Sequence, residues 1–180
     1  MTRICCLSLA GLAAAGCVDV KGSLVVPAGT AADSAEQVMY GVRAPITQSG
    51  VRRGELVADS MYVFENQTRF DFFHGHVDFF MANGAPNGRM RGDRGRYSLQ
   101  TEVLEGWGNV VVATTNGNSL SSPHIVYDQR QDRITSDTNF VFVHNGSTYT
   151  GSRGLETDSR MTRYNCFGVC TATGPVMIPK

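Results

Sequence analysis

Residues 104–112 read LEGWGNVVV, and residues 76–79 and 139–142 read HVDF and NFVF. In these stretches apolar side chains recur at alternate positions, and alternate residues of a β-strand share one face. The pattern therefore predicts three strands, each with an apolar face. The residues expected on that common surface are Val77, Phe79, Val110, Val112, Phe140 and Phe142.

Turn signals recur between these segments. Asn-Gly dipeptides occur at 83–84, 87–88, 116–117 and 145–146, and Asn-Gly between apolar runs is a strong hairpin signal. Turn glycines are predicted at Gly54, Gly88, Gly117 and Gly146, spaced by 34, 29 and 29 residues. Small residues follow four positions later, at Ala58, Gly92, Ser121 and Thr150. The period is that of a repeated two-strand unit.

No window beyond the N-terminus shows helical periodicity, and Pro45, Pro86 and Pro123 interrupt attempts to place a helix. We therefore predict an all-β fold: an elongated, partly open β-jellyroll of repeated antiparallel two-strand units. The alternative is a closed sandwich. A closed sandwich buries the apolar face as core, whereas an open roll offers an apolar trough and free strand edges.

The N-terminus has the parts of a secretory signal: Arg3, an uncharged apolar run from Ile4 to Ala15, and then Gly16-Cys17. Residues 12–17, LAAAGC, resemble a bacterial lipobox, so Cys17 is the expected site of lipidation. The alternative is an ordinary signal peptide with an incidental cysteine. The expected division is a signal at 1–16, a lipidated tether at 17–35, a β-jellyroll domain at 36–165 and a tail at 166–180.

Two further cysteines, Cys166 and Cys170, could form a disulfide in an oxidising compartment. Residues i and i+4 of an extended strand lie roughly 13 Å apart, so pairing requires a turn, which Gly168 makes plausible. Two free thiols, or two ligands of an incomplete metal site, are the competing interpretations.

Several classes of function are disfavoured. The chain has 16 basic and 16 acidic side chains, so it lacks the surplus of positive charge that nucleic-acid binding requires. We expect no enzyme activity and no cofactor, because no nucleophile elbow or nucleotide-binding loop is present. His74 and His76 could bind zinc, but two nitrogens are too few for a structural site, and we predict no metal. The arginines between 89 and 96 could pair with lipid phosphates, although a solvated face is the simpler interpretation.

Residues 88–97, GRMRGDRGRY, and residues 104–112 carry a family resemblance. Together with the anchor, tether and repeated units, they resemble the LptC-type lipopolysaccharide-export proteins and their β-jellyroll relatives, over about Gln37 to Tyr164. The resemblance implies a periplasmic adaptor that holds the acyl chains of lipopolysaccharide. It would pass them from an inner-membrane ABC transporter to an LptA-like bridge protein by edge-strand pairing. The resemblance implies that the inward-facing, lipid-binding positions of the family correspond here to Val77, Phe79, Val110, Val112, Phe140 and Phe142.

The anchor departs from the family pattern. Members are typically held by an uncleaved transmembrane helix, whereas residues 12–17 of this chain resemble a lipobox. The family resemblance implies the periplasmic side of the inner membrane, and the lipobox-like stretch implies a lipid anchor there; the outer membrane is the alternative. The competing function is a structural or adhesive lipoprotein with a closed β core and no lipid transfer.

Overall fold

The computed structural model describes residues 34–174, which form one sheet of twelve antiparallel strands. The strands are β1 (Gln37–Gln48), β2 (Val51–Phe64), β3 (Arg69–Phe80), β4 (Pro86–Ser98), β5 (Val103–Thr114), β6 (Ser119–Asp128), β7 (Arg133–Ser136), β8 (Phe140–His144), β9 (Ser147–Gly151), β10 (Leu155–Asp158), β11 (Tyr164–Cys166) and β12 (Cys170–Thr173). The prediction of an all-β roll is confirmed. Among the described residues no helix is long and apolar enough to cross a membrane.

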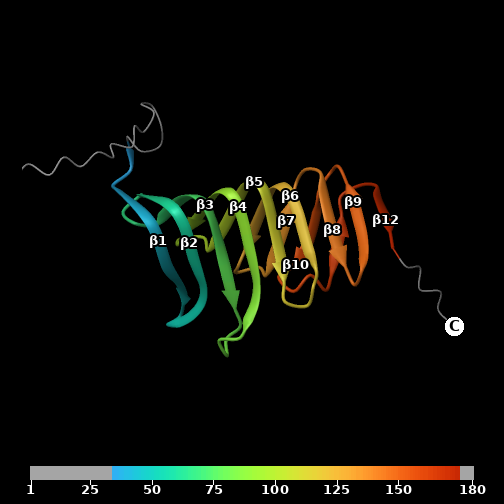
Figure 1. Cartoon of the computed structure of the whole chain (residues 1–180), viewed down its shortest axis with the longest axis horizontal. Helices are drawn as coiled ribbons and strands as arrows, with labels where there is room; N and C mark the ends of the chain where they lie inside the picture. Colours follow the sequence, from blue (N-terminus) through green and yellow to red (C-terminus); the bar gives the residue numbers. More distant parts are fainter. Residues whose placement is uncertain (1–33, 175–180) are drawn as a thin grey trace, which may run out of the picture.

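The sheet begins as a meander and then splits. Strands β1 to β6 pair in sequence order, after which the N-terminal half of β6 pairs with β8 and its C-terminal half with β7. One branch continues through β9 to β12, and the other continues through β10 to β11. Figure 1 shows the strands side by side along the long axis, with β1 at one end and β12 at the other. The segment from residue 166, expected to be a tail, therefore contributes the last strand of the sheet.

The long strands bend near their centres. Positive φ angles occur at Gly41, His74, Gly108 and Asn109, and the β4–β5 and β5–β6 ladders change register close to the last two. A residue with a positive φ angle interrupts the alternation of side chains along the strand. The inward-facing surface therefore stays inward on both sides of the bend. Each long strand thereby contributes to two layers that face each other.

We call these layers 1 and 2. Layer 1 contains residues 42–48, 51–58, 75–80, 86–92, 110–114 and 119–122 with β8, β9 and β12. Layer 2 contains residues 37–40, 60–64, 69–73, 94–98, 103–107 and 124–128 with β7, β10 and β11. Apolar side chains from both layers form one continuous core.

The predicted turns are partly confirmed. Gly84, Gly117 and Gly146 have φ angles of 81°, 88° and 79°, as left-handed turn positions require. The prediction of a turn at Asn87-Gly88 is wrong, because both residues lie in β4. Gly54 likewise lies within β2, and the preceding hairpin turns at Gly50 instead.

The small residues predicted four positions after each turn glycine take the same place in the fold in only some of the units. Ala58 and Gly92 face inward beside the bends, as the alignment of repeats suggests. In the third unit the inward-facing residue is Ser122, which is buried and hydrogen-bonded to Ser136. Ser121 faces outward, between its strand partners Val111 and Val141. In this unit, aligning the repeats by their turn glycines therefore selects the residue that comes one position before the inward-facing one.

Candidate functional site

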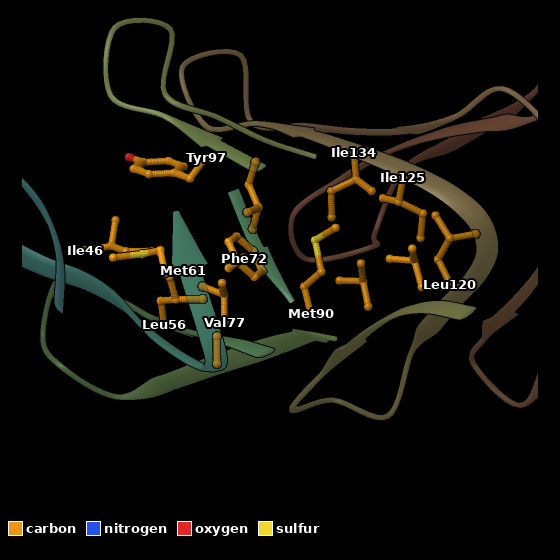
Figure 2. Packing of buried hydrophobic residues seen from close by; sticks show 14 of the residues in the cluster. Ile46, Leu56, Met61, Phe72, Val77, Met90, Tyr97, Leu120, Ile125 and Ile134 are labelled. Carbon is orange, nitrogen blue, oxygen red and sulfur yellow. The ribbon is translucent and has the colours of Figure 1, made fainter. Parts of the chain in front are cut away.

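An apolar cavity of about 210 Å³ lies between the two layers at the β1 end of the roll. Layer 1 contributes residues from β1, β2 and β3, and layer 2 contributes residues from the other halves of β2, β3 and β4. Figure 2 shows Ile46 and Met61 pointing toward the space that Phe72 and Tyr97 also face. The lining consists of Ala44, Pro45, Ile46, Thr47, Leu56, Met61, Phe70, Phe72, Val77, Tyr97 and Leu99.

The chemistry of this lining is almost uniform. Thr47 supplies the one hydroxyl besides that of Tyr97, and no charged side chain is among the residues that line the cavity. Tyr97 is buried, and burial raises the pKa of its phenol, so that the group is neutral at physiological pH. Such a surface can bind hydrocarbon but has no group suited to a charged ligand or to a reaction.

The six residues predicted to share an apolar face do lie on the inner side of layer 1. Five of them are buried and Phe79 is partly buried against the core. Of the six, however, only Val77 lines the cavity. Phe79 packs edge-on against Tyr127 of layer 2, with ring centroids 5.3 Å apart. Val110 and Phe142 are fully buried by neighbouring side chains. Whether these residues contact lipid is not tested by their burial and stays a prediction.

The interior is densely filled away from the β1 end. A Cβ added at Gly106 would lie 2.6 Å from Cε of Met90, so the methionine of layer 1 packs directly on the backbone of layer 2. Leu120, Ile125 and Leu155 have no exposed surface. Of the space enclosed between the two layers of the described strands, most therefore lies near β1.

A larger depression lies on the outside of the roll, where β6 passes from one layer to the other at Pro123. It measures about 620 Å³ and is lined by Asn109, Asn139 and the outward Val111 and Val141, and also by Val110 and Phe140, which are themselves buried. This depression is wide and shallow, and it lies beside the bends and not between the layers. It does not enclose a ligand as the cavity at the β1 end does.

The arginines of β4 are mostly engaged by other side chains on the outer face. Arg89 donates two hydrogen bonds to Asp78, at 2.5 and 2.9 Å, and Arg96 donates two to Asp71, at 2.7 and 2.9 Å. The guanidinium of Arg94 lies 5.1 Å from the ring centroid of Trp107. These contacts favour a structural role for Arg89, Arg94 and Arg96, because their charges are already paired or stacked.

The remaining candidates from the sequence have simple surroundings. Cys166 and Cys170 form a disulfide, with Cα atoms 6.3 Å apart. His74 lies at a bend, 3.8 Å from Asp59 and exposed. Within residues 34–174 no three His, Cys, Asp or Glu side chains converge as metal ligands. Cys17 and the expected signal lie outside the described residues.

Sequence reasoning missed most of the cavity. Its rim on β1 is formed by Ala44 and Ile46, and alternation in residues 42–46, VRAPI, was a usable signal for them. It also missed the contact that closes the side of the roll near the cavity. There Gln48, at the end of β1, donates a hydrogen bond of 2.6 Å to Glu102, in the turn between β4 and β5. No local pattern relates two residues 54 positions apart.

Comparisons with known proteins agree with this architecture. The family model described as "Lipopolysaccharide-assembly, LptC-related" matches residues 30–164. Among solved structures the chain is similar to LptH from Pseudomonas aeruginosa, described as the LptA-homologous periplasmic component of the lipopolysaccharide transport device. The identity is 14%, the TM-score is 0.55, and the alignment covers 70% of this chain and 95% of LptH. None of the curated proteins compared matches the chain significantly.

Proposed function

Because the chain belongs to the LptC-related lipopolysaccharide-assembly family, we propose that it is a periplasmic adaptor that shields lipid A acyl chains between the layers of its roll. The single observation that carries the proposal is the uncharged apolar cavity at the β1 end. The role needs no reactive group. Energy for transport comes from a partner, which we propose to be the inner-membrane ABC transporter complex of lipopolysaccharide export.

The physical basis is the hydrophobic effect. Each methylene group moved from water to an apolar site contributes about 0.8 kcal/mol, so several acyl chains cannot cross an aqueous compartment without cover. The cavity of about 210 Å³ is below the roughly 300–1,000 Å³ typical of small-molecule sites. It therefore accepts part of one acyl chain as it stands, and a larger lipid requires the layers to separate further.

Separation of the layers also determines the role of the deeper residues. Val77 contacts lipid first, because it lines the cavity. Phe79, Val110, Val112, Phe140 and Phe142 lie farther along the same inner face and become lipid contacts only when the layers move apart. We propose the order of contact to be from β3 toward β8.

The sheet edge at β1 supports the proposed partner. This strand has twelve residues and an unpaired outer edge within the described part of the chain, and Val38 and Tyr40 on it are exposed. An LptA-like bridge protein can extend the sheet by adding a strand there. Lipidation at Cys17 would hold the roll at a membrane, and we propose the periplasmic face of the inner membrane.

A photocrosslinking experiment tests the function. A benzoylphenylalanine residue is placed at Ala44, which faces the cavity, or at its neighbour Arg43, which faces outward, in the full-length protein. After irradiation with purified lipopolysaccharide, we expect an adduct at position 44 and none at position 43. Equal adduct formation at both positions, or none at either in a folded protein, would contradict the proposal.

A second candidate is a structural or adhesive lipoprotein with a closed core. It is favoured by the filled interior beyond Met90, where Leu120, Ile125 and Leu155 have no exposed surface. The same experiment separates the two functions, because a closed core gives no lipid adduct at position 44.

A further inference from the structure

The interior of the roll is divided just beyond the cavity at the β1 end. Phe72 and Val77 line this cavity, and the same two residues line a second void of about 10 Å³ on the side toward β5. The second void also borders Met90 and Leu104. Figure 2 shows Phe72 between Met61, which lines the cavity, and Met90. Side chains that border both spaces form the wall between them, so Phe72 and Val77 separate the cavity from the interior farther along the roll.

The Phe72 ring spans the space between the two layers at this wall. Phe72 belongs to layer 2, where a Cβ added at Gly95 would lie 2.1 Å from Cζ of the ring. On layer 1, a Cβ added at Gly75 would lie 3.1 Å from Cδ2 of the same ring. The ring therefore lies against the backbone of both layers, which come within one ring of each other here. As long as the ring keeps this position, it closes the inner end of the cavity.

The ring is the part of this wall that can move. Val77 is 1% exposed, and its β-branched side chain has few rotamers. Phe72 borders the free space of the cavity, so a change of its χ1 rotamer can turn the ring into that space and uncover the backbone of Gly95. Beyond the ring lies Met90, whose unbranched side chain adapts readily to the shape of a neighbour. No backbone movement is needed for a hydrocarbon chain to pass along the uncovered wall.

We propose that Phe72 is an internal gate of the roll. In the position seen here its ring ends the cavity, and an acyl chain advances toward Met90 and Leu104 only when the ring turns away from Gly95. This inference rests on the proposed function and adds a control point to it. The movement of one side chain then precedes any separation of the layers deeper in the roll.

The experiment locates the tail of a bound hydrocarbon chain on either side of the gate. Purified full-length protein is irradiated with a palmitate that carries a diazirine at its methyl end, and the adducts are located by mass spectrometry. In the wild type we expect adducts on cavity residues such as Leu56 and Met61. In Phe72→Ala we expect adducts on Met90 and Leu104, at least tenfold above their wild-type yield.

Phe70→Ala is the matched control. Phe70 lies on the same strand and lines the same cavity, but it does not border the second void. Its truncation enlarges the cavity without opening the wall, so the adducts should stay on the cavity side. Phe72→Leu is a milder variant in case the alanine variant does not fold, and it should give an intermediate yield on Met90 and Leu104. Far-ultraviolet circular dichroism establishes that each variant is folded.

The possible outcomes separate the gate from the proposed function. If the adducts on Met90 and Leu104 were equal in the wild type and in the Phe72 variants, the gate would be overturned while lipid binding was supported. The same gain in Phe70→Ala would also overturn it, because enlargement of the cavity would then be sufficient. If no variant and no wild-type protein gave adducts inside the roll, lipid binding itself would be overturned, and the gate with it.

Discussion

The ring of Phe72 lies directly on Gly95 of the neighbouring strand. The two residues are paired in the β3–β4 ladder, and a Cβ added at Gly95 would lie 2.1 Å from Cζ of Phe72. The absence of a side chain at 95 thus allows the ring to lie flat along layer 2 and form a wall of the cavity. Gly95 is required here by the close approach of the ring.

The first prediction is that Gly95→Ala destabilises the roll. Overpacking of a filled interior typically costs about 1–3 kcal/mol, and we expect a loss of about 2 kcal/mol in the free energy of unfolding, measured with urea. The double variant Phe72→Leu with Gly95→Ala should lose less than the sum of the single variants, because leucine leaves room for the methyl group. Additive losses in the free energy of unfolding would show that the Phe72 ring and the methyl group added at residue 95 do not clash.

The second prediction uses two arginines of β4 with the same geometry and different burial. Each makes a bidentate contact with an aspartate, but the Asp71 side chain is 4% exposed and the Asp78 side chain 24%. Arg96→Ala leaves a buried carboxylate without its principal partner, and we expect a loss of about 1.5–3 kcal/mol. Arg89→Ala at the more exposed pair should cost at most about 1 kcal/mol. Equal losses on urea unfolding would contradict the role of burial.

The third prediction concerns pH and His124. Its Nε2 lies 2.9 Å from Glu105 and its Nδ1 lies 3.0 Å from Asp137, so only the protonated ring can donate to both carboxylates. Burial lowers the pKa of His124, but these hydrogen bonds outweigh burial and raise the pKa above its ordinary value. The stabilisation is therefore complete below the unfolded pKa and is lost as pH rises through the folded pKa.

We expect His124→Gln to reduce the free energy of unfolding at about pH 5.5 and to have a smaller effect at about pH 8.5, on either side of the ordinary histidine pKa of about 6.5. His74→Gln is the matched control, because the His74 side chain is 71% exposed and its carboxylate neighbour lies at 3.8 Å. Thermal unfolding at the two pH values measures the difference. A loss that is the same at both would show that the charge on His124 does not stabilise the fold.

The sequence predicted those parts of the fold that depend on local pattern. Alternation correctly placed Val77, Val110 and Phe142 on one inner face, because each lies in a segment on one side of a bend. Alternation does not extend through the bends, where His74 and Asn109 have positive φ angles and shift the inward phase. The wrong turn at Asn87-Gly88 has a similar origin, since Asn83-Gly84 four residues earlier already reverses the chain and leaves the second dipeptide in a strand.

The cavity and its closure were less predictable, for a different reason. Gln48 and Glu102 meet only because the layers fold over each other, and the same is true of Asn118 and Met161. Such contacts depend on the register of several strands at once. Residue type alone also could not show which apolar positions are filled by neighbours and which face free space. Val77 and Val110 have the same pattern in sequence, yet only Val77 borders the cavity.

The last prediction concerns the Cys166–Cys170 disulfide, which joins β11 to β12. It encloses a loop of only five residues, from 166 to 170, and the chain-entropy relation gives about 2 kcal/mol of stabilisation for a loop of this size at 25 °C. We expect reduction to lower the free energy of unfolding by about that amount, measured by urea unfolding with and without a reductant. The Cys166→Ser, Cys170→Ser variant should match the reduced protein and should not respond to the reductant.

The loss of stability should affect the C-terminal strands before it affects the whole fold. Strands β11 and β12 have only three and four residues, and few other contacts hold them. Hydrogen exchange is expected to accelerate first in β12 and in its partner β9, while amides of β2 and β3 keep their protection. Uniform acceleration across all strands would mean that the disulfide stabilises the whole roll and not its end. Unchanged exchange in β9 after reduction would mean that packing alone, including the contacts of Tyr149 with Phe142 and Tyr164, holds these strands together.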